Sequence, residues 1–501
     1  MTTARFFTSL LTAAGAAAYI HAPLSPPKLQ AFETLARELT AQRYPNQEFV
    51  GNIPWYPYAI DVGVGTPAQT QSLVLSLAHS DTYVLYHDVC DPNSNPDSTR
   101  YLRNCSSGSY DEETSTTFSQ DYYHEYSDDF AGIGTYGVMV GESLSIGDTE
   151  FSNVSLAVAM KTSLDTGFLG LSIPRKYVDG KAVDRGTSIL DQMVSQEVVE
   201  SPAFSIYAEE GRNSTTGGIL FGAVDKSKYD GELRRIQASV ARDKFENFEA
   251  NYLVNVSAAW KRESRNDELS QYVSPDMGET AFYGRGGTFY AAIDLTFLIT
   301  NVPAYVAYPI YMMGGGFSQW HNIDMWTVDC DGTGDLNGTF SLELGGEGGY
   351  RLTANLRDLI VPPEQWHLLR PAKDGSGERI KHCLFGIQSS KSEYFHYDGS
   401  GWTSSWVIGS MLLRNTYTVF DSKNMEVSLA PLRKNPSEKG NIVPFGSSGA
   451  HAPDSELIGY QECFPDGCEA EEEDEDAGAH IVMQKGLLVG LVLGALWFVS
   501  L

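Results

Sequence analysis

The chain has 501 residues, 64 of them acidic and 35 basic, so its formal net charge is -29 at pH 7. Hydrophobic residues make up 42% and aromatic residues 12%, which excludes a mostly disordered or collagen-like chain. The acidity argues against nucleic acid as a partner, because neutralising phosphates needs clustered Lys and Arg.

The first residues have the pattern of a secretory signal peptide. Arg5 precedes a short apolar run with small residues before Pro23, and cleavage after Ala18 or Ala22 is consistent with that pattern. We therefore assign residues 1–22 to the signal peptide. Residues 23–48 contain proline and then a helix-like stretch, and we interpret them as a short pro-segment-like region.

Strand-like sequence punctuated by glycine follows almost to residue 432, with short helical stretches such as SILDQMVSQEVV. This pattern predicts an all-β body with few helices. The body contains a coarse two-fold echo, because each half has an apolar-apolar-glycine step. These steps are Phe168-Leu169-Gly170 and Val407-Ile408-Gly409.

The C-terminal region predicts a membrane-attached protein outside the cytosol. Residues 435–479 are polar and end in the run EAEEEDED, which we interpret as an acidic stalk. Small residues at 477–479, a short spacer and the apolar run Gly486–Leu501 are typical of a GPI-attachment signal, so we assign residues 480–501 to that signal. A plain tail anchor is the alternative.

The cysteines and glycosylation sequons agree with a secreted protein. The six cysteines form three neighbouring pairs, and three local disulfides are the simplest of 15 possible pairings. The pairs are Cys90 with Cys105, Cys330 with Cys383, and Cys463 with Cys468. N-glycosylation is expected at several sequons, which are Asn104, Asn153, Asn213, Asn255 and Asn337.

The body resembles the pepsin family of aspartic peptidases, and in particular its fungal GPI-anchored members. The segments that carry the resemblance, in order, are GVGTPAQTQSLVLSLAHSDTYVLY, TGFLGLS, SPAFSIYAEE, GGILFGAVDKSKYDGEL and SWVIGSMLLRNTYTVFDSKNMEVSLAPL. The resemblance implies a bilobal all-β fold with a cleft between an N-terminal lobe, 49–235, and a C-terminal lobe, 236–434. It also implies that Cys90–Cys105 and Cys330–Cys383 are the two bridges common in the family.

The family's chemistry needs two facing carboxylates that share a proton, and one of them is missing here. Aligned from Gly65-Thr66-Pro67, the first Asp-Thr-Gly motif begins at Ser76, whereas the second retains its carboxylate at Asp294. The hydroxyl residue of each motif, which crosses the axis to the opposite loop, has become Leu77 or Leu295. We interpret this as a polar lock between the lobes replaced by an apolar contact.

The remaining segments also depart from the family. Tyr126 occupies the position of the flap tyrosine that covers the substrate, but Ser127 and Asp129 replace glycines, which predicts a stiffer flap. In the family, a basic pro-segment masks the acidic cleft until activation. The pro-segment-like region here has few basic residues, which is consistent either with a protein that has no activity to mask or with a pro-segment that is simply short. Since Ser76 cannot serve as a general base, we predict a proteolytically inactive or strongly impaired protein that keeps a peptide-binding groove.

The same residues also allow other functions. An active aspartic-type endopeptidase that relies on Asp294 is the main alternative. A serine hydrolase built from Ser76, His79 and Asp81 is disfavoured, because no Gly-x-Ser-x-Gly elbow surrounds the serine. No metal-binding spacing of histidines and no cofactor motif is present. We expect a monomer without metal or cofactor, with a protein or peptide ligand in the cleft and the membrane as partners through the GPI anchor.

Overall fold

A computed structural model describes most of the predicted body. It covers residues 19–25, 57–90, 105, 107–130, 133–162, 164, 166–178, 181–184, 188–208, 217–242, 249–262, 269–273, 289–312, 318–320, 325–330, 336, 338–346, 348–361, 382–390, 406–434 and 439–459. These residues form mostly β-strands with a few short helices, as the sequence predicts.

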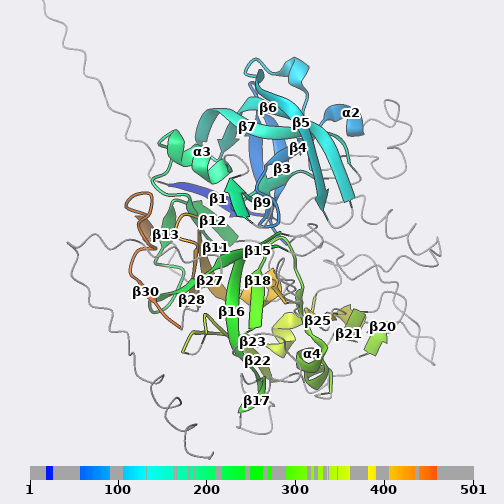
Figure 1. The fold of residues 1–501 in the computed structure, drawn as a ribbon, viewed down its shortest axis with the longest axis vertical. Helices are drawn as coiled ribbons and strands as arrows, with labels where there is room; N and C mark the ends of the chain where they lie inside the picture. Colours follow the sequence, from blue (N-terminus) through cyan, green and yellow to red (C-terminus); the bar gives the residue numbers. More distant parts are fainter. Residues whose placement is uncertain are drawn as a thin grey trace, which may run out of the picture. The chain divides into compact units, whose positions relative to one another are not determined.

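The N-terminal lobe contains a seven-stranded sheet (Figure 1). In sheet order its strands are β2 (Ala59–Val64), β3 (Gln69–Ser76), β8 (Phe168–Gly170), β4 (Tyr83–Leu85), β7 (Thr149–Lys161), β6 (Ile133–Ile146) and β5 (Ser119–Phe130). Because β3 lies inside the sheet between β2 and β8, its last six residues are buried, which explains the unbroken apolar run Leu73–Leu75. The other described elements here are α2 (His87–Cys90), η2 (Glu112–Thr114), β9 (Arg175–Val178), β10 (Lys181–Asp184) and α3 (Ile189–Ser195).

The C-terminal lobe contains a nine-stranded sheet organised around one long strand, β16 (Glu249–Arg262). The other strands are β15 (Ser239–Arg242), β17 (Leu269–Val273), β18 (Phe289–Ile293), β19 (Thr300–Pro303), β22 (Thr339–Leu344), β23 (Tyr350–Asn355), β25 (Ile387–Ser390) and β26 (Val407–Ile408). A three-stranded sheet of β20 (Ser318–Trp320), β21 (Met325–Asp329) and β24 (His382–Leu384) accompanies it, with helices α4 (Ala304–Tyr311), η4 (Leu356–Leu359) and α5 (Ser410–Leu413).

The two apolar-apolar-glycine steps occupy equivalent places in the two lobes. Phe168–Gly170 forms β8 and pairs in parallel with the end of β3, while Val407–Ile408 forms β26 and pairs in parallel with the end of β18. The glycine of each step is required by packing. A Cβ on Gly170 would lie 2.5 Å from the carbonyl oxygen of Asp81, and one on Gly409 would lie 2.2 Å from that of Ile299.

A third sheet has seven strands and joins both halves of the sequence. In order these are β1 (Ile20–Leu24), β12 (Gly217–Phe221), β11 (Ala203–Ala208), β27 (Thr416–Asp421), β28 (Glu426–Pro431), β14 (Leu233–Gln237) and β30 (Ser455–Leu457). The predicted lobe boundary at residue 235 falls inside β14, so this strand belongs to the shared sheet rather than to either lobe alone.

Strand β1 corrects the predicted N-terminal boundary. It pairs along its whole length with β12 and buries Ile20, Ala22 and Leu24. Ser25 then exchanges two backbone hydrogen bonds with Ala59, of 2.9 and 2.8 Å. Cleavage after Ala22 would remove three of the five residues of β1, whereas cleavage after Ala18 would leave the strand intact, so Ala18 is the better of the two predicted sites.

The predicted stalk is wrong in its first part, because residues 439–459 pack on the body. This C-terminal clasp (residues 439–459) contributes β29 (Ile442–Pro444), which pairs with β13 (Ala223–Asp225), and β30, which pairs in parallel with β14. Its Phe445 and Ala452 are buried with Tyr417 and Val419. The segment is polar overall, so its composition did not indicate that these two apolar residues are buried. The acidic run and residues 480–501 lie outside the described residues.

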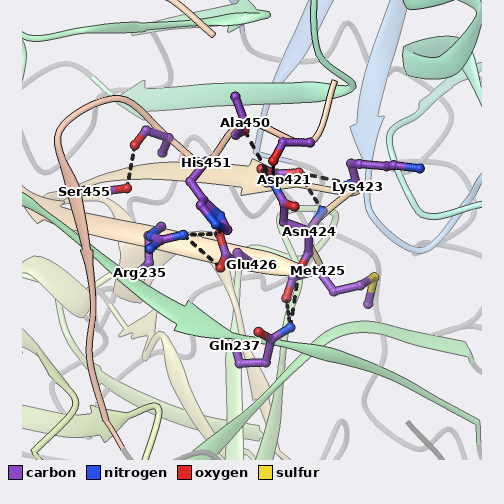
Figure 2. Close-up of polar contacts among 12 residues, drawn as sticks. Arg235, Gln237, Asp421, Lys423, Asn424, Met425, Glu426, Ala450, His451 and Ser455 are labelled. Carbon is purple, nitrogen blue, oxygen red and sulfur yellow. Dashed lines mark hydrogen bonds and ion pairs between the residues drawn. The ribbon is translucent and has the colours of Figure 1, made fainter. Parts of the chain in front are cut away.

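The clasp is also held by a charged cluster on the shared sheet (Figure 2). Arg235 on β14 contacts both carboxylate oxygens of Glu426 at 3.1 Å, and His451 of the clasp lies 2.9 Å from Glu426 Oε2. In Figure 2 both side chains point toward Glu426. The cluster therefore joins β14, β28 and the clasp.

Two of the predicted disulfides are formed, Cys90–Cys105 and Cys330–Cys383; Cys463 and Cys468 lie outside the described residues. Among the sequons, Asn104, Asn213 and Asn337 also lie outside them. Asn153 is exposed, but Asn255 is only 7% exposed within β16. In the folded chain a glycan on Asn255 would have to displace the packing of the sheet, so the burial of this residue disfavours the site, and the glycosylation sites stay predictions.

Within the described part of the chain, no helix has the length and hydropathy needed to cross a bilayer.

Candidate active site

The first site loop begins where β3 ends, at Ser76. This side chain is 0% exposed and accepts a 3.2 Å hydrogen bond from the backbone N–H of Ala78. Its Oγ also lies 2.6 Å from Nδ1 of His79, three residues along the loop. The loop therefore holds the serine in one position from two sides.

The second loop follows β18 and contains Asp294, which is 3% exposed. Its backbone N–H donates to the Ile408 carbonyl at 3.1 Å, and its Oδ1 accepts from the Thr296 N–H at 2.8 Å. Burial raises the pKa of the Asp294 carboxyl above its usual value, and the hydrogen bonds from Thr296 and the nearby His79 oppose that rise. The carboxyl group is thus held more easily in its neutral form.

Thr296 links the two loops, which sequence reasoning missed. Its Oγ1 accepts hydrogen bonds from the backbone N–H groups of Leu77 at 2.9 Å and Ala78 at 3.2 Å, and it lies 3.1 Å from Ser76 Oγ. The Thr296 side chain also hydrogen-bonds the Asp294 carboxyl, so one hydroxyl joins Asp294, Ser76 and the backbone of the first loop. Ser76 Oγ and His79 Nδ1, 2.6 Å apart, form a further hydrogen bond, whose donor depends on the tautomer of the imidazole.

This contact corrects the predicted apolar lock. Leu77 and Leu295 are indeed buried and belong to one hydrophobic cluster, but a polar lock between the loops is also present, supplied by Thr296. The threonine stands where the family motif has glycine. The signal in the sequence was therefore a hydroxyl residue one position after Leu295.

His79 connects this loop to the hairpin of β5 and β6. Its Nε2 lies 3.0 Å from Oδ2 of Asp128, whose side chain is 23% exposed, on β5. Ser76, His79 and Asp128 thus form a chain of a hydroxyl, an imidazole and a carboxylate. The carboxylate is Asp128 rather than the Asp81 considered from the sequence.

The chain does not make an accessible nucleophile. Ser76 and Thr296 are both completely buried, and the Thr296 hydroxyl lies within hydrogen-bonding distance of Ser76 Oγ. A nucleophilic serine needs space beside its oxygen for a substrate carbonyl. The arrangement therefore supports a closed structural network rather than a serine hydrolase.

The segment expected to form the flap is the β5–β6 hairpin, in which Tyr126 pairs with Gly137. Tyr126 is buried, and its ring centroid lies 6.2 Å from that of Tyr83. Ala78 of the first loop and Phe297 of the second pack against the same hydrophobic cluster. The flap tyrosine therefore belongs to a hydrophobic cluster against which one residue of each site loop packs.

No group of three or more His, Cys, Asp or Glu side chains in the described part of the chain is arranged to hold a metal ion.

The raised pKa of Asp294 predicts a pH-dependent cost to stability. Below the unfolded-state pKa of about 3.9, the carboxyl is neutral in both states and costs nothing. Between that pH and the higher pKa of the folded state, the carboxyl ionises in the unfolded chain but not in the folded protein, so rising pH progressively lowers the free energy of unfolding. We expect Asp294→Asn to unfold like the wild type near pH 3 but to be more stable at pH 7. Denaturant unfolding across this range tests it, with the exposed Asp148→Asn as control; equal pH profiles would contradict it.

Comparison with known proteins gives a consistent result. Residues 57–432 match the family described as eukaryotic aspartyl protease. "Probable aspartic-type endopeptidase opsB" of Aspergillus fumigatus is 23% identical over 80% of this chain and 74% of its own length. Barrierpepsin of Saccharomyces cerevisiae is 24% identical over 81% of this chain and 66% of its own. The crystal structure of the aspartic proteinase from Irpex lacteus has a TM-score of 0.52 at 20% identity, covering 76% of this chain and 95% of that one, and it shows the same bilobal fold.

Proposed function

This chain is a member of the pepsin-like eukaryotic aspartyl protease family, and from that premise we propose that it is a cell-surface homologue with little or no peptidase activity. In this proposal it keeps a groove between the lobes that binds a protein or peptide ligand. Strand pairing would be the mode of binding, as for other extended peptides.

The observation that carries the proposal is the pair Ser76 and Thr296. Aspartic peptidase chemistry uses one ionised carboxylate as general base for a water and one neutral carboxyl as acid. A serine at position 76 does not ionise in the working pH range and cannot accept that proton. The Thr296 hydroxyl, 3.1 Å from Ser76 Oγ, occupies the space beside the serine that a shared water would need.

Asp294 by itself supplies only half of the chemistry. Its buried carboxyl, with its raised pKa, is suited to the role of the acid, so the alternative of a weak endopeptidase relying on Asp294 remains. Loss of one general acid–base group typically costs about 10²- to 10⁴-fold in rate. The altered loop adds to that loss.

The deciding experiment is a cleavage assay with the purified ectodomain. Denatured protein is incubated with it at about pH 3–6, the range in which carboxyl groups titrate. We expect no cleavage above the background given by Asp294→Asn. Cleavage by the wild type that disappears in Asp294→Asn would reject the inactive assignment in favour of the endopeptidase.

We also propose that the protein reaches the cell surface and is attached there by a GPI anchor. The signal-like N-terminus and the two disulfides support a secreted protein, as do relatives such as secreted aspartic protease 9 of Candida albicans. The anchor rests on the sequence of residues 477–501 alone. Release from intact cells by a phosphatidylinositol-specific phospholipase is its test.

A further inference from the structure

The flap touches the floor of the site through a polar and an apolar contact. The polar contact joins Asp128 of β5 to His79 of the first loop at 3.0 Å. The apolar contact is Tyr126, which is buried in a cluster that also receives Ala78 and Phe297. Both contacts come from the same strand, two residues apart, so they close the hairpin at one place.

The polar contact depends on Ser76. His79 Nδ1 lies 2.6 Å from Ser76 Oγ, and Nε2 of the same ring lies 3.0 Å from Asp128 Oδ2. A hydrogen bond at Nδ1 restricts rotation of the ring, so the serine sets the orientation in which the imidazole meets the flap.

We propose that the chain Ser76–His79–Asp128 is a latch that holds the flap closed over the site loops in the free protein. In this arrangement His79 and Ser76 are positioning residues, and the flap must release Asp128 before a ligand can enter. The latch rests on the contacts themselves, whereas its role as an autoinhibitory gate rests on the groove binding proposed above.

The strands of the flap hairpin supply no Lys or Arg side chain that could pair with Asp128 in place of His79. The sequences of β5 and β6 contain Asp121, Glu125, Asp128, Asp129 and Glu142 but no Lys or Arg. Lys161 on the adjacent β7 lies 5.9 Å above the ring of Tyr136. His79 is therefore the basic side chain that the structure places against Asp128.

Hydrogen exchange of the flap amides, residues 119–146, tests the latch without needing a ligand or any catalysis. The experiment compares the full chain with Asp128→Asn and, as a matched control, Glu125→Gln, an exposed carboxylate on the same strand. We expect about tenfold faster exchange of the hairpin in Asp128→Asn, because opening of a local unit governs exchange, and no change in Glu125→Gln. Equal exchange in Asp128→Asn and wild type would overturn the latch.

A double-mutant cycle tests the part of Ser76. Ser76→Ala should speed flap exchange in the wild-type background but add little in Asp128→Asn, where the chain is already broken. If Ser76→Ala speeds exchange equally in both backgrounds, the serine does not act through the latch and that part is rejected. Protein cleavage in the assay above would reject the proposed function while leaving these exchange results unaffected.

Discussion

Replacing Glu426 by alanine should lower the free energy of unfolding by about 3–5 kcal/mol, the usual cost of breaking a buried ion pair. The Glu426 side chain is 5% exposed and is bound by Arg235 and His451. Its removal leaves the largely buried Arg235 guanidinium without its carboxylate and releases His451 of the clasp. Denaturant unfolding measures the change, and limited proteolysis near residues 439–459 would report loosening of the clasp.

The neighbouring ion pair provides the control. Arg234 and Glu456 also join β14 to the clasp, but their side chains are 40% and 59% exposed. An exposed pair contributes about 0–1 kcal/mol, so Glu456→Ala should be nearly neutral. If Glu426→Ala and Glu456→Ala have equal effects, the cluster in Figure 2 does not hold the clasp as its geometry suggests.

Replacing Thr296 by valine should cost about 1–3 kcal/mol of unfolding free energy. Valine keeps the shape of threonine but removes the hydroxyl that accepts from the N–H groups of Leu77 and Ala78. The Ala78 N–H keeps Ser76 Oγ as an acceptor, whereas the Leu77 N–H loses the acceptor that Thr296 supplies, and a buried donor left without a partner costs about 1–3 kcal/mol. Because Thr296 and Leu77 lie in loops of different lobes, the loss should weaken the docking of the two loops.

Thr296→Ser is the matched control, since serine retains the hydroxyl and loses only a methyl group. Chemical unfolding of the three proteins should therefore rank wild type and Thr296→Ser well above Thr296→Val. Equal stability of the serine and valine variants would show that the hydroxyl is not the lock between the loops and that the buried leucines suffice.

Polar contacts join the two site loops and the flap hairpin. The hydroxyl groups of Ser76 and Thr296 lie 3.1 Å apart, and Ser76 Oγ lies 2.6 Å from Nδ1 of His79. The other imidazole nitrogen lies 3.0 Å from the carboxylate of Asp128. Under the proposed function, in which position 76 has lost a catalytic carboxylate, these contacts give the buried Ser76 hydroxyl its partners, which offsets the cost of burying a polar group.

Much of the fold could be read from the sequence because it depends on local patterns. The apolar run of β3 and the glycines at 170 and 409 specify strands and close backbone approaches wherever they occur. The order of the family segments then placed these strands in two lobes. The same reasoning placed Ser76 and Asp294 at the ends of β3 and β18, where the structure has them.

The differences from expectation concern segments whose environment the local pattern does not contain. Residues 439–459 look like a solvated stalk, yet their Phe445 and Ala452 are buried in a hydrophobic cluster with residues of the shared sheet. Asn255 has an intact sequon, but the residue is buried within β16. Residues 20–22 look like the end of a signal peptide, but they form part of strand β1 because they pair with β12, some two hundred residues away in the sequence.

The sequence by itself determined the family, the β-rich lobes and the absence of an aspartate at position 76, since each is a property of residue identity and short spacing. Only the tertiary structure decided which groups Ser76 and His79 contact. Thr296 meets Ser76 across 220 positions of chain, and Asp128 meets His79 from a different strand. Partners so distant are set by how the lobes and the hairpin pack, because a polar contact forms only where packing brings the two groups within about 3 Å.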